Sequence, residues 1–93
     1  MMLVELVQVT RNQTGYGLSK IYLNPRHIVF ISEDAKMKTL MRESSNLGLA
    51  PETTFSTIRI NDGGLNREIS VVGDPTMIES KIFRKKRQNV LRG

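Results

Sequence analysis

The sequence predicts one small, mainly β domain of the α+β class, in which a curled antiparallel sheet of four to six short strands packs against one C-terminal helix. Three observations predict this class. At 93 residues the chain falls within the size range of a single domain and buries about 60–65% of its unfolded surface on folding. Its apolar residues fall in short runs rich in β-branched side chains, and a helix-start signal followed by apolar residues appears only near the end.

The first half of the chain predicts three strands. Residues 3–10 are β-branched and too few for a buried helix, so they predict a largely covered strand. Turn formers at residues 12–17 predict a loop or a wide hairpin. Residues 21–23 and 28–31 predict two more strands, separated by a turn at Asn24-Pro25-Arg26, where proline fixes φ and removes a donor.

The clearest hairpin prediction surrounds Asn61-Asp62-Gly63-Gly64, which supplies the positive-φ positions of a tight turn. Ile58 and Ile60 alternate with polar residues before this turn, and Ile69 and Val71 alternate after it. The core predicted for the whole sheet comprises Leu6, Val7, Val9, Ile21, Leu23, Val29, Ile31, Ile58, Ile60, Ile69 and Val71.

Residues 33–54 fit two alternatives, because a long structureless segment is uncommon inside a small domain. In one, Asp34 caps a short helix with Met37, Leu40 and Met41 on one face. In the other, residues 36–42 extend the preceding strand into an arm whose tip is residues 44–48. We expect a mobile flap and leave helix and strand open.

The final helix begins at Asp74-Pro75, an N-cap followed by proline at the first helical position. Met77, Ile78 and Ile82 follow at helical spacing and predict the face that docks on the sheet. After Phe83 the apolar pattern stops, so we expect a domain of residues 1–83 and a basic extension of residues 84–93.

The positive charge of the chain is concentrated in this extension. Residues 1–80 carry eight basic and nine acidic residues, a net charge of −1, whereas residues 81–93 carry six basic residues and no acidic one. We predict that they contact about four to six nucleic-acid phosphates. An anionic membrane surface or an acidic protein would attract the same charges, and a solubilising tail explains them equally well. The candidate nucleic-acid-binding residues are Lys81, Arg84, Lys85, Lys86, Arg87 and Arg92.

Other functions have little support in the sequence. Without cysteine, the chain has no disulfide, thiolate zinc site or cysteine nucleophile, which suits a reducing compartment such as the cytoplasm. His27 is the single histidine, and its place beside the proline turn favours a structural imidazole over a catalytic or metal-binding one. We predict no enzyme activity, no metal and no cofactor. No apolar run is long enough to span a membrane, and no signal peptide is expected.

The order of these signals resembles the FlbD/SwrD family of small flagellar and swarming accessory proteins. The resemblance lies in Val9-Thr10-Arg11, residues 21–31, Thr57-Ile58-Arg59-Ile60, Val71-Val72, and Ile78, Lys81 and Ile82. It implies a short β-meander followed by a helix, without enzyme activity, acting through protein contacts at the flagellar motor. The chain departs from the family in residues 12–19, in residues 33–54 and after Phe83. The layout would also suit a phage-borne regulatory protein.

Two functions are therefore expected. The first is a regulator that contacts DNA or RNA through its basic helix, joined by Arg11, Arg26 and Arg59 if these share a face. The second is a protein-interaction module that uses a sheet edge or the flap at residues 33–54. Small sheets leave exposed edges, so we also expect a homo-oligomer or an added partner strand.

Overall fold

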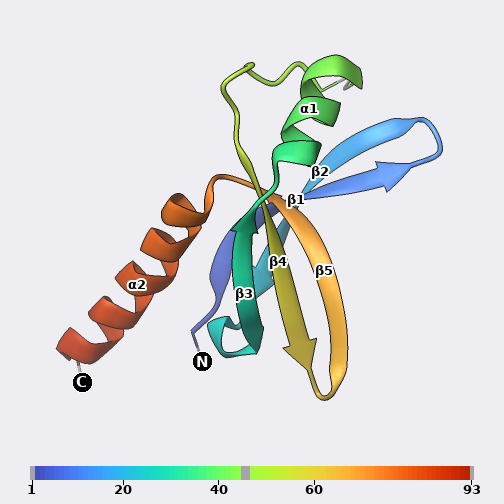
Figure 1. Ribbon diagram of the computed structural model, residues 1–93. Helices are drawn as coiled ribbons and strands as arrows, with labels where there is room; N and C mark the ends of the chain where they lie inside the picture. Colours follow the sequence, from blue (N-terminus) through green and yellow to red (C-terminus); the bar gives the residue numbers. More distant parts are fainter. Residues whose placement is uncertain (1, 45–46, 93) are drawn as a thin grey trace.

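The computed structural model describes residues 2–44 and 47–92, and for residue 44 and residues 84–92 it describes the backbone alone. The described chain forms five strands, one 3-10 helix and two α-helices (Figure 1). In chain order these are β1 (Val4–Asn12), β2 (Gly15–Leu23), η1 (Pro25–His27), β3 (Ile28–Glu33), α1 (Ala35–Ser44), β4 (Phe55–Asp62), β5 (Leu65–Val72) and α2 (Pro75–Arg92).

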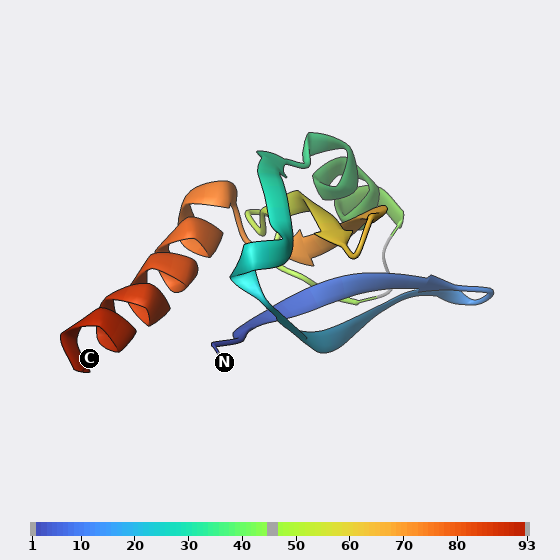
Figure 2. The ribbon, with the colours of Figure 1, turned by 90° about the horizontal axis from the view of Figure 1, so that it is seen from below.

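The five strands form one open antiparallel sheet in the order β2-β1-β5-β4-β3. β1 and β5 share only the Gln8–Val71 position in their register, whereas β4 and β5 pair along their whole length. The β1–β2 hairpin therefore crosses the other three strands at an angle and gives the sheet its curl (Figures 1 and 2). This architecture confirms the predicted fold class.

Each face of the sheet buries its own apolar cluster. The larger cluster lies on the concave face, beside α2, and its buried members are Val4, Leu6, Ile58, Ile60, Val71 and Ile78. The smaller cluster lies on the other face, beneath α1, and consists of Val9, Met41 and Phe55. Side chains alternate along a strand, so residues at odd and even positions of β1 and β4 serve different cores, and the two helices end up on different sides (Figure 2).

The core prediction is mostly confirmed and has one clear error. Val29 is 57% exposed because the β3–β4 register shifts between Ile28 and Phe30, and the extra residue of this β-bulge points away from the core. Val7 is half-buried. Leu6, Val9, Ile58, Ile60 and Val71 are buried, and Ile21, Leu23, Ile31 and Ile69 pack against the larger cluster. The prediction omitted Val4, Met41, Phe55 and Ile78, which are buried.

Both hairpins have two-residue turns. Asn12 Oδ1 accepts hydrogen bonds from Thr14 N at 3.0 Å and Thr14 Oγ1 at 2.9 Å, and β2 already begins at Gly15. The prediction of a wide loop over residues 12–17 is therefore wrong, because this side-chain bond tightens the turn. The β4–β5 hairpin is confirmed: Gly63 and Gly64 have φ of 63° and 90°, as a type I′ turn requires.

Residues 35–44 form a helix, so the strand-extension alternative is wrong. Asp34 caps α1, because its Oδ1 accepts a hydrogen bond from Met37 N at 2.9 Å. Met41 is buried and Met37 is half-buried against the sheet, whereas Leu40 is exposed, contrary to the predicted face. The described part of the flap is thus packed on the sheet, and residues 45 and 46 of the predicted tip lie outside the described residues.

Candidate functional site

The first residues of α2 are tied to β4 by short hydrogen bonds. Gly73 N donates to Thr54 O at 2.7 Å, and Gly73 O accepts from the fully buried Ser56 Oγ at 2.7 Å. Gly73 adopts φ of 115°, a conformation that favours glycine. Asp74 then caps the helix as predicted, because its Oδ1 accepts from Met77 N at 2.8 Å. These contacts fix the direction in which α2 leaves the sheet.

α2 docks on the sheet only through its beginning. Ile78 is buried and Ile82 packs against the larger cluster, whereas Met77 is 51% exposed and Phe83 is 60% exposed. The prediction that Met77 lies on the docking face is therefore wrong, because Ile78 and Ile82, four residues apart, define that face. At 1.5 Å per residue the helix continues about 14 Å beyond Phe83, and it leads away from the sheet (Figures 1 and 2).

This projecting helix carries the candidate nucleic-acid-binding residues. Lys81 is exposed, one helical position before the docked Ile82. Arg84, Lys85, Lys86, Arg87 and Arg92 lie on the backbone of α2, and their side chains lie outside the described residues. Because residues 1–80 have a net charge of −1, the charge of this chain is divided between a nearly neutral domain and a strongly basic helix.

The other three arginines do not form one face with each other. Arg11 lies near the β1–β2 turn, with its guanidinium 5.9 Å from the Tyr16 ring centroid. Arg26 lies in η1, beyond the opposite end of the same hairpin, which at about 3.3 Å per residue places it more than about 20 Å away. Arg59 lies on the α1 face, 3.7 Å from Glu68 and stacked over Phe30. The wider basic surface is thus absent.

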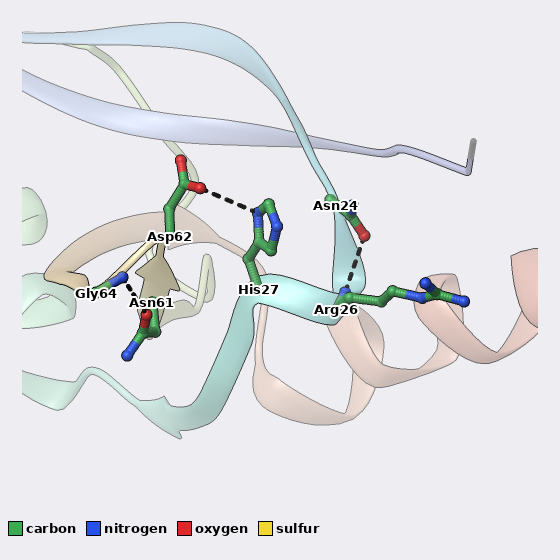
Figure 3. Close-up of polar contacts among 6 residues, drawn as sticks. All are labelled: Asn24, Arg26, His27, Asn61, Asp62 and Gly64. Carbon is green, nitrogen blue, oxygen red and sulfur yellow. Dashed lines mark hydrogen bonds and ion pairs between the residues drawn. The ribbon is translucent and has the colours of Figure 1, made fainter.

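His27 joins two turns at the lower end of the sheet (Figure 3). Its Nδ1 lies 3.9 Å from Asp62 Oδ1, and the two side chains are 43% and 65% exposed. The nearby asparagines are occupied locally: Asn24 Oδ1 accepts from Arg26 N at 3.0 Å and Asn61 Oδ1 accepts from Gly64 N at 3.1 Å. This geometry is that of a surface cross-link between η1 and the β4–β5 hairpin.

Sequence reasoning missed the polar cluster that holds α1 on the sheet. Besides capping α1, Asp34 accepts hydrogen bonds at Oδ2 from Thr57 Oγ1 at 2.8 Å and Ser70 Oγ at 3.2 Å. Thr57 and Ser70 are opposite one another in the β4–β5 register, so one carboxylate joins a helix start to two neighbouring strands. The cap was visible in the sequence, but the hydroxyl partners are 23 and 36 residues away.

The described residues offer little for small-molecule chemistry. Within residues 2–44 and 47–92, no three histidine, cysteine or acidic residues come together in a way that could hold a metal ion. A cavity between α1 and residues 49–55 has a volume of only about 10 Å³, which is close to the minimum for one water molecule. Among the described helices, none has the length and apolar character needed to cross a membrane.

Comparison of the chain with protein-family models, with curated proteins and with solved structures gave no match. The resemblance to the FlbD/SwrD family therefore stays a prediction. The fold and the candidate site together define a small open-sheet β domain with a projecting basic helix.

Proposed function

We propose that this chain is a non-enzymatic regulatory protein that binds nucleic acid, with α2 as its contact element. One observation carries the proposal: α2 docks through Ile78 and Ile82 and then leaves the sheet with a run of basic residues that no acidic residue interrupts. Lysine and arginine side chains that neutralise phosphates release condensed counterions, which gives affinity without requiring a particular base sequence.

The same features favour contacts to the phosphate backbone over base recognition. Phe55 is buried and Phe30 lies beneath Arg59, so neither is available to stack on a base. Phe83 is 60% exposed and directly precedes the basic run, which makes it the aromatic residue of α2 best placed to stack on an unpaired base. We therefore expect similar affinity for unrelated sequences, and a modest preference for single strands.

A salt titration tests the proposal. The full chain is titrated onto a labelled duplex and a labelled single strand at about 50 to 300 mM salt, and we expect a log–log slope of about −3 to −5 on duplex DNA. A chain truncated after Phe83 should lose binding. Arg84→Gln/Lys85→Gln/Lys86→Gln should flatten the slope by about three contacts.

A matched variant removes the same number of charges elsewhere. Lys36→Gln/Lys38→Gln/Arg42→Gln neutralises the three basic residues of α1 and should leave the slope unchanged. Equal losses in both triple variants would overturn the assignment to α2. Absence of binding by the full chain at 50 mM salt, or binding to anionic vesicles and not to nucleic acid, would overturn the proposed function itself.

The alternative function is a protein-interaction accessory module that uses a sheet edge or the region of residues 33–54. The exposed apolar residues of the edge strands favour it: Leu18 and Tyr22 on β2 are 41% and 58% exposed, and Val29 and Phe30 on β3 are 57% and 41% exposed. Within residues 33–54, α1 already uses its apolar face against the sheet, so the edges are the better candidates. Truncation after Phe83 should spare this activity, which separates it from nucleic-acid binding.

A further inference from the structure

The two edges of the sheet differ in how open they are. β3 has six residues, carries the bulge at Val29, and contributes Ile28 and Ile31 to the cluster that α2 covers. A short, bulged edge beside a helix is poorly suited to adding a strand. β2 has nine residues in continuous register with β1, and in the described chain β1 is its sole strand partner.

The register shows which backbone groups of β2 face outward. Gly15 pairs with Asn12 across the two-residue turn, so the odd-numbered residues of β2 exchange hydrogen bonds with β1. The N–H and C=O groups of Leu18, Lys20 and Tyr22 then point to the free side of the strand. None of these three residues has a backbone hydrogen bond to another segment within residues 2–44 and 47–92.

We propose that β2 pairs antiparallel with β2 of a second copy of this chain, about a two-fold axis at Ser19. Gly15 then lies opposite Leu23 of the second copy, so all nine residues of the strand overlap. Leu18 and Lys20 exchange backbone hydrogen bonds across the axis, and the two five-stranded sheets become one. This inference does not depend on nucleic-acid binding by α2.

The side chains of β2 complement one another in this register. Gly17 lies opposite Ile21 and Gly15 opposite Leu23, so glycine accommodates a bulky residue at the closely spaced pairs. Lys20 lies opposite Leu18 and covers it with its alkyl chain. Centring the axis on Lys20 would set two lysines directly opposite, which is destabilising. Centring it on Leu18 would leave the exposed Tyr22 outside the pairing.

A cysteine at the proposed axis gives a direct test. Ser19 is the residue that faces its own copy, at a non-hydrogen-bonded position where Cα atoms are about 4.5 Å apart, within the range of about 4.4–6.8 Å that a disulfide spans. Because the chain has no cysteine, mild oxidation of Ser19→Cys should give a covalent dimer in non-reducing gel electrophoresis. Ser32→Cys, on the β3 edge, should stay monomeric. Equal cross-linking of the two variants would overturn the proposal.

Sedimentation equilibrium supplies the second readout. Leu18→Lys places lysine opposite Lys20 twice in the dimer and should raise the dimer dissociation constant about tenfold. Leu65→Lys, at a side chain 75% exposed on the other hairpin, should leave it unchanged. Truncation after Phe83 should also leave it unchanged, so failure of the nucleic-acid proposal would not affect this result. A wild-type chain that stays monomeric at high micromolar concentration would overturn the dimer.

Discussion

Asp34 is the residue whose removal should reveal most about how this fold is held together. It caps α1 through Met37 N at 2.9 Å, and it accepts hydrogen bonds from Thr57 and Ser70 at 2.8 and 3.2 Å. Its own N–H donates to Phe55 O at 2.9 Å, and a substitution keeps that backbone bond. Asp34→Ala therefore removes three side-chain bonds at once and leaves two part-buried hydroxyls without their acceptor.

The expected loss follows from these contacts. Loss of an N-cap typically costs about 1 kcal/mol, and each hydrogen bond to a hydroxyl contributes about 1 kcal/mol net. Asp34→Ala should lower the free energy of unfolding by about 3 kcal/mol. For a domain of this size that corresponds to about 12–24 °C in Tm. Because domains are stable by only about 5–15 kcal/mol, the variant should remain folded at room temperature.

Urea unfolding followed by far-UV circular dichroism measures this loss. Asp34→Asn is the matched control, because asparagine caps helices as well as aspartate does and should retain about two thirds of the stabilisation. Combining Asp34→Ala with Thr57→Val should give less than the sum of the separate losses, since both remove the same bond. An Asp34→Ala loss below about 0.5 kcal/mol, or full additivity with Thr57→Val, would refute the reasoning.

The remaining stability predictions concern α2 and His27. Ile78→Ala should cost about 2–5 kcal/mol because this side chain is 1% exposed in the larger cluster, whereas Phe83→Ala, at 60% exposure, should cost less than about 0.5 kcal/mol; equal thermal shifts in the two variants would contradict the docking described for α2. His27→Ala should change the free energy of unfolding by less than about 0.5 kcal/mol, because the pair with Asp62 is long and exposed. A larger loss in urea unfolding would show that the cross-link between η1 and the hairpin stabilises the fold.

Much of the fold could be predicted because its signals are local. Alternation at Ile58 and Ile60, the glycine pair of the β4–β5 turn, and the Asp74-Pro75 helix start each depend on residues a few positions apart. The tight turn after Asn12 was missed, although its signal is also local, because a side-chain bond and not a glycine pair shapes it. The basic run after Phe83 was equally visible, since net charge needs no structure to be counted.

The errors have a common cause in long-range packing. Val29 matches a strand pattern, but the pairing of β3 with β4 creates the bulge that exposes it. Met77 has helical spacing, but the direction in which α2 meets the sheet selects Ile78 instead. Residues 33–54 could become helix or strand until Met41 found a cluster with Phe55 and Val9.

The sequence by itself determined the class of the domain, its two hairpins, its final helix and the concentration of charge at one end. Tertiary structure alone decided the strand order, the two separate cores and the Asp34 contacts to Thr57 and Ser70. It also decided that Arg11, Arg26 and Arg59 lie apart from one another, and that β2 is the open edge. Local propensities depend on neighbouring residues, whereas strand order and burial depend on contacts between segments that are distant in the chain.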